Sequence, residues 1–431
     1  MKNKIFKLTK QPFVRNVIIL SSGTAGAQVI AMLLSPVITR LYGPEAYGVM
    51  GTFAAIISII TPIAAFTFPV AIVLPKLDSE AKGLIRLSLF ISTLLSMTIG
   101  ILLFLFHKQM VSIFNLEEIS AYLFLIPVVV FSAGFLQVIE QWLIRNKQFT
   151  VSAYSVLIQS IVVSGSKVVV GFFYPIATVL VFITAFNQGF KALLMNFLTM
   201  KSDYKLSFQK ISKKVSYKGL FKKYKDFPIF RAPEVFINGI SENLPIILLT
   251  SLFGPASAGF YSICKTVLNA PSNLIGKSVG NVFYPRITEA ANNDENLTKL
   301  IKKATYALGA VGILPYGIVV IFGPELFSIV FGENWTAAGE YARWIALLSF
   351  FGFINKPCVK ALPVLKAQKF QLMYTIFSLI IKVILIAIGF YVFTSDYIAV
   401  ALFSISGAML HLGLILITIR LSMRFDRDHK I

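Results

Sequence analysis

Apolar runs of about 20 residues, separated by charged or Gly/Pro-containing segments, recur along the whole chain, and such a run spans the bilayer core as a helix. Of the 431 residues, 56% are hydrophobic and 14% are charged. In lipid, only helices and closed barrels satisfy their backbone hydrogen bonds. The sequence therefore predicts an all-α polytopic membrane protein with about 12 transmembrane helices. The expected spans are 14–39, 49–74, 84–106, 119–142, 153–174, 176–198, 230–253, 259–284, 304–323, 339–355, 370–393 and 397–419.

The distribution of positive charge predicts the orientation of these spans. An even number of spans puts both termini on one side. Of the 40 Lys and Arg residues, 31 lie in or beside the termini and loops on that side, two lie on the other side, and seven lie inside spans. Positive residues accumulate on the cytoplasmic side, so both termini are expected there. The formal charge of +21 is thus a topology signal, and nucleic acid is not an expected partner.

The two halves of the chain resemble each other. Leu-Tyr-Gly43-Pro44 matches Leu-Phe-Gly254-Pro255 at an offset of 211 residues, and Pro75-Lys-Leu matches Pro285-Arg-Ile at an offset of 210. Duplicated transporter halves place their substrate between them. We expect an N-terminal six-helix lobe at 1–200, a basic cytoplasmic linker at 201–228 lying on the lipid surface, and a C-terminal six-helix lobe at 229–431. A central cationic cavity is expected between the lobes.

The span 259–284 carries a polar stripe. Lys265, Asn269, Asn273, Lys277 and Asn281 follow one another at four-residue spacing, which places them along one side of a helix. Polar and charged groups inside a membrane usually face a protein interior or a water-filled path. We therefore assign these five side chains to substrate binding, with snorkelling toward the interface as the alternative for the two lysines.

Two further lysines lie deep within spans. Lys382 and Lys167 are assigned to the same substrate path, and a buried ion pair is the alternative for each. Arg15 and Gln28 add polar groups to the first span, and they are assigned to substrate binding as well. A third lysine, Lys191, is expected to snorkel toward the interface.

Acidic residues are concentrated in the span 230–253. Glu234 and Glu242 lie on one helical face, and they are the candidates for carrying a coupling proton. The alternative is that Glu242 only neutralises a neighbouring lysine.

The seven basic residues inside the spans outnumber the four acidic ones, which leaves a surplus of positive charge. Such a cavity favours an anion, and the many Asn, Gln, Ser and Tyr groups suit one rich in hydroxyls. A lipid diphosphate carrying a sugar chain meets both conditions. The three histidines are far apart, so no metal or other cofactor is expected. The short loops leave no room for a soluble catalytic domain, so no catalytic residue is assigned and an enzyme is not expected.

Several motifs resemble those of a known transporter family. They are Arg15-Asn-Val, Ser22-Gly23-Thr24, Thr39-Arg-Leu-Tyr-Gly-Pro-Glu-Ala-Tyr-Gly48, Ala71-Ile-Val-Leu-Pro75, Leu252-Phe-Gly-Pro255, Ala258-Gly-Phe-Tyr261 and Phe283-Tyr-Pro-Arg-Ile287. In these the chain resembles the polysaccharide biosynthesis and O-antigen flippases (Wzx type) of the MOP (multidrug/oligosaccharidyl-lipid/polysaccharide) exporter superfamily. One departure is Phe68-Pro69, where many relatives have an aromatic-acidic pair.

The resemblance implies a flippase of the bacterial inner membrane. Its substrate would be an undecaprenyl-diphosphate-linked oligosaccharide repeat unit, moved to the periplasmic face by alternating access for O-antigen, capsule or exopolysaccharide assembly. Candidate protein partners are a polymerase and other glycan-assembly proteins, alongside membrane lipids.

Other functions remain as alternatives. A lipid II exporter of the same superfamily is compatible with a basic cavity, whereas a multidrug exporter handling cations should have an acidic one. A membrane-embedded glycan polymerase or ligase is expected to have a long outer loop with clustered Arg and His. The outer loops here contain only Arg40 and Lys108 as basic residues. A non-transporting scaffold would leave the intramembrane lysines unexplained.

Overall fold

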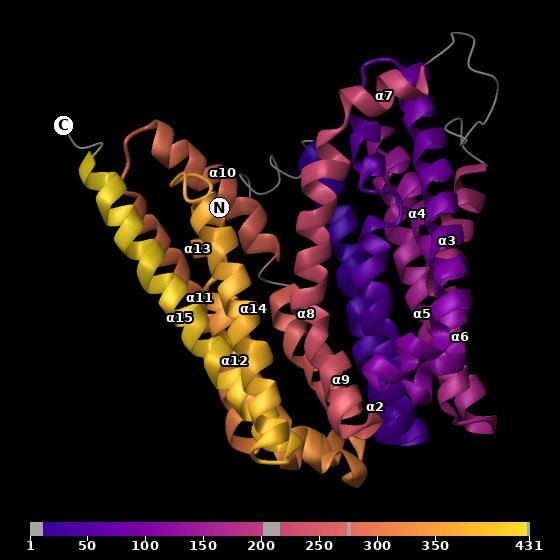
Figure 1. The fold of residues 1–431 in the computed structure, drawn as a ribbon. Helices are drawn as coiled ribbons and strands as arrows, with labels where there is room; N and C mark the ends of the chain where they lie inside the picture. The colour runs from indigo at the N-terminus through magenta and orange to yellow at the C-terminus, as the bar shows by residue number, and fades with distance from the viewer. Residues whose placement is uncertain (1–11, 201–215, 274–276, 429–431) are drawn as a thin grey trace. The chain divides into compact units, whose positions relative to one another are not determined.

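The computed structural model describes residues 12–200, 216–273 and 277–428, with backbone only for 12–18, 200 and 277–282. Across these ranges the chain forms helices and turns but no strand, which confirms the all-α fold (Figure 1). The α-helices are α2 (Pro12–Ile60), α3 (Asp78–Phe114), α4 (Ile126–Arg145), α5 (Phe149–Phe173), α6 (Ala177–Met200), α7 (Tyr217–Lys223), α8 (Ala232–Phe253), α9 (Pro255–Pro271), α10 (Lys277–Asn292), α11 (Leu297–Phe331), α12 (Thr336–Ile354), α13 (Lys356–Ala361), α14 (Gln368–Tyr391) and α15 (Asp396–Asp428). Short helical turns are η1 (Thr61–Ile63), η2 (Phe68–Val73), η3 (Glu117–Leu125), η4 (Phe227–Arg231) and η6 (Glu333–Trp335).

The chain divides into two compact units, Met1–Ser251 and Leu252–Ile431. The first unit includes α7 and α8. The boundary between the units therefore falls at the end of α8. The lobe limits at 200 and 229, and the central cavity between lobes, stay predictions.

Nine helical segments of the described chain are long and apolar enough to cross a membrane, against twelve predicted spans. The difference has physical causes. A single 45-residue segment, Ile19–Ile63, covers most of the first predicted span and the larger part of the second. The predicted span 259–284 is divided between α9 and α10, of 17 and 16 residues. In α12, Glu340 and Arg343 lower the mean hydropathy.

The repeated Gly-Pro pairs have the same backbone conformation in both halves. Gly43 has φ 70° and ψ 173°, and Gly254 has φ 89° and ψ 174°. This region of conformational space is accessible essentially only to glycine. At each pair a helix ends at the glycine, and the proline occupies the first turn of the next helix, where its missing N–H has no cost. The sequence repeat thus corresponds to a repeated helix–helix junction.

Alanine at Gly43 is expected to destabilise the protein by about 1–3 kcal/mol, because a Cβ is strained at this φ and ψ. Nothing lies within 4 Å of the added Cβ, so the cost arises from the backbone alone. The matched control is Gly165→Ala in α5, where the added Cβ also meets open space but the backbone is helical. That control should be stabilised by about 0.5–1 kcal/mol. Thermal unfolding in detergent measures both, and equal shifts in the two variants would contradict the interpretation.

The first unit is built on the pairing of α2 with α5 and of α3 with α4, while α6 packs on α4 and α5. Apolar side chains on the opposite face of α3 are exposed, including Phe90, Met97 and Phe104 at 66%, 61% and 80%. Exposed apolar surface of this extent on a long helix is typical of contact with lipid.

Part of the basic linker packs against the first unit. Leu220 and Tyr224, at the end of α7, are buried in a core with Phe68 and Trp142. Lys223 pairs with Glu80 at 2.5 Å, and this hydrogen bond raises the pKa of Lys223. Tyr224 is therefore buried in protein, which corrects the expectation that the whole linker lies on the lipid surface. Residues 201–215 of the linker lie outside the described part of the chain.

In the second unit, close helix packing depends on glycine. A Cβ at Gly339 of α12 would lie 2.4 Å from Cα of Pro324 in α11, so only glycine permits this approach. The backbones of α11 and α12 thus come close, and α15 packs on both α12 and α14. This bundle of α11, α12, α14 and α15 holds Lys382 and the helix ends discussed below.

Candidate functional site

Lys382 of α14 lies against α15 in the second unit. Its Nζ is 5.5 Å from the ring centroid of Phe403, and its Cε would lie 3.0 Å from a Cβ at Gly407. No carboxylate pairs with Lys382 among the described residues. The missing side chain of Gly407 leaves room for the amine, and the aromatic face partly compensates its charge. The predicted alternative for Lys382, a buried ion pair, is absent within the described chain.

A histidine lies on the same face of α15 as Gly407. His411 follows Gly407 by one helical turn, and its Nδ1 is 3.2 Å from Nδ2 of Asn355 at the end of α12. The Oδ1 of Asn355 is buried without a hydrogen-bond partner among the described residues. Lys382, His411 and Asn355 thus form a polar cluster where α12, α14 and α15 meet. The sequence did not indicate this cluster, because its three members lie on three different helices.

Lys167 of α5 faces α2 in the first unit. Its Nζ lies 3.4 Å from Sδ of Met50, a weak acceptor, and its backbone carbonyl accepts a hydrogen bond from the hydroxyl of Tyr42 at 2.8 Å. Among the described residues no carboxylate pairs with this lysine either. The two deepest predicted lysines therefore share one property, an ammonium group without an anionic partner in the described chain.

The polar stripe of α9 lies off the packed face of that helix. Tyr261, Cys264 and Leu268 are buried, and the thiol of Cys264 donates to the carbonyl of Ala338 at 2.9 Å. The stripe residues Lys265 and Asn269 are half-buried, and Asn273 is exposed. The predicted wet, substrate-facing side of this stripe stays a prediction.

The remaining predicted binding residues are less completely placed. Gln28 is half-buried on α2. Lys277 and Asn281 belong to α10 and Arg15 to α2, but the side chains of all three lie outside the described part of the structure. The assignment of the whole set to substrate binding stays a prediction.

The acidic face of α8 is exposed on the first unit. Glu234, Asn238 and Glu242 are all exposed, while Asn243 and Leu249 on another face are buried. Helix α8 is attached near its end, where the hydroxyls of Thr52 and Thr250 lie 2.5 Å apart. Because carboxylates do not face lipid without cost, this face requires water or a protein partner. Its role in coupling stays a prediction.

Lys191 does not snorkel. Its Nζ lies 2.7 Å from Oε1 of Glu140 on α4, and the two side chains are 16% and 34% exposed. This ion pair corrects the expectation for Lys191. Because Glu140 compensates the charge of Lys191, this lysine does not need an anionic substrate as a partner.

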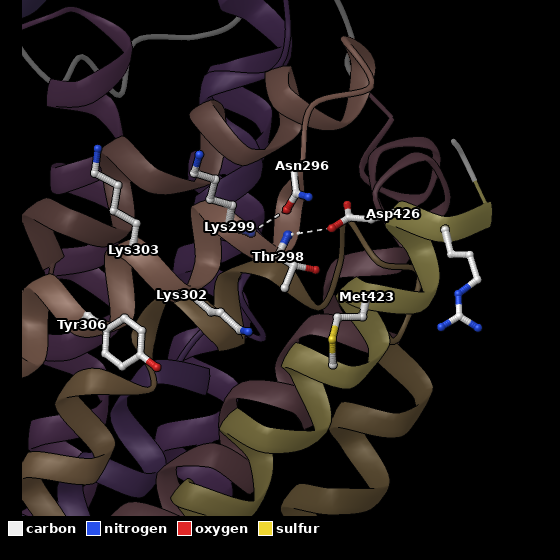
Figure 2. Close-up of a pocket in the computed structure, with 9 residues that line it drawn as sticks. Asn296, Thr298, Lys299, Lys302, Lys303, Tyr306, Met423 and Asp426 are labelled. Carbon is white, nitrogen blue, oxygen red and sulfur yellow. Dashed lines mark hydrogen bonds between the residues drawn. The ribbon is translucent and has the colours of Figure 1, made fainter. Parts of the chain in front are cut away.

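The sequence also missed a cationic cavity of about 870 Å³ between the start of α11 and the end of α15. Its lining includes Lys299, Lys302, Lys303 and Arg427, with Asp426 as its carboxylate (Figure 2). In the sequence these cations count only toward the charge that predicts topology. The three- and four-residue spacing of the lysines, which places them on neighbouring parts of one helix face, was the available signal.

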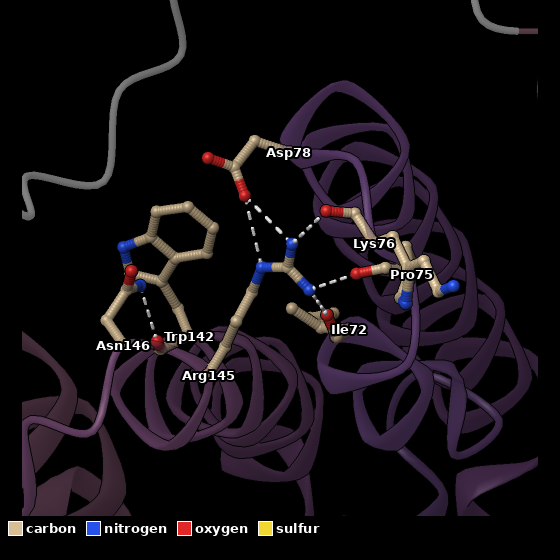
Figure 3. Close-up of polar contacts among 7 residues, drawn as sticks. All are labelled: Ile72, Pro75, Lys76, Asp78, Trp142, Arg145 and Asn146. Carbon is tan, nitrogen blue, oxygen red and sulfur yellow. Dashed lines mark hydrogen bonds and ion pairs between the residues drawn. The ribbon is translucent and has the colours of Figure 1, made fainter.

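Sequence reasoning also missed a set of contacts that holds the backbone of the motif Ala71-Ile-Val-Leu-Pro75 in place. The guanidinium of Arg145, at the end of α4, donates to the carbonyls of Pro75 at 2.6 Å, Ile72 at 3.3 Å and Lys76 at 3.5 Å. It also pairs with Asp78 at 2.8 Å, in the first turn of α3 (Figure 3). One side chain thus holds the connection between η2 and α3 against α4.

Solved structures with similar folds are transporters. A lipid II flippase MurJ in an inward closed conformation has a TM-score of 0.71, with 13% identity, covering 96% of this chain and 90% of that one. An inward-facing multidrug resistance MATE family transporter of the MOP superfamily has a TM-score of 0.65, with 12% identity over 95% of both chains. A Vibrio cholerae MATE transporter has a TM-score of 0.59, with 12% identity over 97% of both. The fold is therefore the one found in MOP-superfamily transporters.

Sequence comparison places the chain more narrowly. The family model described as polysaccharide biosynthesis protein matches residues 37–340. The chain belongs to this polysaccharide biosynthesis family, which confirms the resemblance seen in its motifs. The inner membrane protein YghQ of Escherichia coli K12 is 34% identical over 95 residues. That alignment covers 21% of this chain and 26% of YghQ, so the chain matches only about a quarter of the length of this relative.

Proposed function

We propose that this protein is a flippase that moves an undecaprenyl-diphosphate-linked oligosaccharide repeat unit from the cytoplasmic to the periplasmic face of a bacterial inner membrane. The product would enter O-antigen, capsule or other surface polysaccharide assembly. The observation that carries the proposal is the pair of intramembrane lysines, Lys167 and Lys382, without a carboxylate partner in the described chain. They occur in a member of a polysaccharide biosynthesis family that has a transporter fold.

The chemistry of these lysines favours a phosphate-bearing substrate. A lysine near the middle of a membrane costs about 2.5–3.5 kcal/mol on insertion scales, so one without a partner needs a compensating role. A diphosphate supplies the missing negative charge while it passes. The polar side of α9, with Lys265 and Asn269, and Asn273 just after that helix offer donors suited to phosphate and sugar hydroxyls. Lys277, Asn281, Arg15 and Gln28 complete the proposed binding set.

The exposed acids of α8 are the proposed coupling groups. Protonation of Glu242 or Glu234 would remove a negative charge that repels the diphosphate, so proton uptake and substrate entry would support each other. An interior-negative membrane potential adds about 2.3 kcal/mol per charge per 100 mV for an outward-moving anion. The protein itself is proposed to carry out transport without chemical change of its substrate.

Reconstituted protein tests the function directly. Proteoliposomes are loaded with a fluorescent polyprenyl-diphosphate oligosaccharide, and a membrane-impermeant quencher reports the accessible fraction with time. Protein-dependent exchange between leaflets is expected, with little exchange in empty liposomes. Fluorescent lipid II in parallel vesicles separates the two substrates. Exchange of lipid II alone would assign the protein to lipid II export, and exchange of neither would overturn the proposal.

A further inference from the structure

The cationic cavity at the start of α11 continues into an apolar groove. The cavity of about 870 Å³ and a neighbouring one of about 420 Å³ share Lys302 and Tyr306, which lie one turn apart on α11. The second cavity is lined by Gly309 and Ile313 of α11 and by Leu412 and Leu416 of α15, among others. Charge at one end and aliphatic surface at the other, with a tyrosine between them, are the features of a site for an amphipathic molecule.

We propose that this α11–α15 groove binds an anionic glycerophospholipid, with its phosphate at Lys299 and Lys302 and one acyl chain along Gly309, Ile313 and Leu416. The site is separate from the proposed substrate residues, all of which lie outside both linings. It adds a resident lipid to the proposed transport function without depending on it.

The charges at the mouth of the groove favour an anion. Lys299, Lys302, Lys303 and Arg427 line the cavity and form no ion pair among the described residues. Asp426 is already engaged, because its two carboxylate oxygens each accept from a backbone N–H, of Leu297 and of Thr298, at 2.9 Å.

The start of α11 itself is closed to an incoming anion. Besides the two N–H groups held by Asp426, the N–H of Lys299 donates to Oδ1 of Asn296 at 2.7 Å. Figure 2 shows Lys302 extending from α11 toward Met423 of α15, while Lys299 and Lys303 extend together in another direction. One of these long side chains must therefore turn for Lys299 and Lys302 to hold the same phosphate. A phosphate would therefore be held by the lysine ammonium groups and not by the end of the helix.

The length of the groove along α11 matches the hydrocarbon thickness of one leaflet. From Lys302 to Ile313, α11 rises about 16 Å at 1.5 Å per residue. Half of a hydrocarbon core about 30 Å thick is about 15 Å. An acyl chain of a lipid in that leaflet fills this length, whereas an undecaprenyl chain is several times longer. The groove is also open, since Ile313 and Leu416 are 65% and 54% exposed and a Cβ at Gly309 meets nothing within 4 Å.

Lipid titration of the purified full-length protein tests this site. Delipidated protein in detergent is titrated with fluorescent phosphatidylglycerol, with phosphatidylcholine and a polyprenyl monophosphate as competitors. Because each lysine near an anionic lipid contributes about fivefold in affinity, Lys299→Gln with Lys302→Gln should weaken phosphatidylglycerol binding about 25-fold. Gly309→Leu should weaken it by filling the groove with a side chain. Higher salt should also weaken it, since the mouth of the groove is exposed.

Matched variants serve as controls. Lys360→Gln with Lys369→Gln removes the same charge from exposed lysines outside the groove, and Gly317→Leu adds the same side chain elsewhere on α11, where a Cβ also meets open space. Both should bind phosphatidylglycerol as the wild type does. Equal loss in the control and groove variants would overturn the proposal, as would equal affinity for phosphatidylcholine. Stronger competition by polyprenyl phosphate than by unlabelled phosphatidylglycerol would overturn it too.

Discussion

Replacing Lys382 with methionine is expected to reduce surface glycan display about thirtyfold or more, while the protein becomes more stable. The loss follows from removing a charge that pairs with the diphosphate, which costs at least about 2 kcal/mol when one partner is truncated. The gain in stability follows because methionine keeps much of the volume of lysine and removes an ammonium group that no carboxylate compensates. Glycan display in a strain that depends on this protein, and thermal unfolding of the purified variant, measure the two effects.

The controls separate charge from packing. Lys382→Arg keeps the positive charge and should retain more display than Lys382→Met. Lys167→Met should behave as Lys382→Met does, because its ammonium donates to the sulfur of Met50 and no carboxylate pairs with it in the described chain. Lys222→Ala changes an exposed lysine outside the predicted spans and should have no effect. Normal display in both methionine variants, at normal protein level, would rule out the proposed role of these lysines.

Replacing Arg145 with alanine is expected to destabilise the first unit by about 3 kcal/mol, because carbonyls inside a packed connection lose a charged donor. The Arg145 side chain is 12% exposed, and it donates to three carbonyls between Ile72 and Lys76. The contact with Asp78 contributes less, since that carboxylate is 72% exposed and solvent screens it. Thermal unfolding in detergent and the amount of folded protein in the membrane provide the measurement.

Three variants set the scale for this effect. Arg145→Lys replaces the planar guanidinium, with its five N–H donors, by a single ammonium group. An intermediate loss of stability is therefore expected. Asp78→Asn should cost less than about 1 kcal/mol, as exposed ion pairs do. Arg424→Ala, an exposed arginine on α15, should leave stability unchanged. If Asp78→Asn destabilises as strongly as Arg145→Ala, the carbonyl contacts are not the main contribution.

Much of the fold was accessible to sequence reasoning because the bilayer imposes it. Long apolar runs must become helices in lipid, so the all-α membrane class followed from composition and spacing. The family followed from local motifs such as the Gly43-Pro44 segment, whose backbone conformation only glycine adopts readily. The number of spans was less accessible. Helices α9 and α10 fall short of a full span on either side of Pro271, and α12 loses apolar character through Glu340 and Arg343.

The site was only partly accessible for a different reason. Helical periodicity identifies residues that share a face of one helix, such as Lys265 and Asn269, and the structure leaves both off the packed face of α9. It does not identify partners on other helices. Lys191 and Lys382 are both lysines within apolar runs, and the sequence does not show that Glu140 pairs with the first and an aromatic ring lies beside the second.

The sequence by itself determined that this chain is a helical membrane protein of a polysaccharide biosynthesis family, since hydropathy and short motifs are properties of contiguous residues. Only the tertiary structure decided which charges have partners and where helix ends converge. It showed the ion pair of Lys191 with Glu140, the polar cluster around His411 and the groove between α11 and α15. It also showed the hydrogen bonds from Arg145 to the connection between η2 and α3. Each of these depends on side chains far apart in the chain, which come together only when the helices pack.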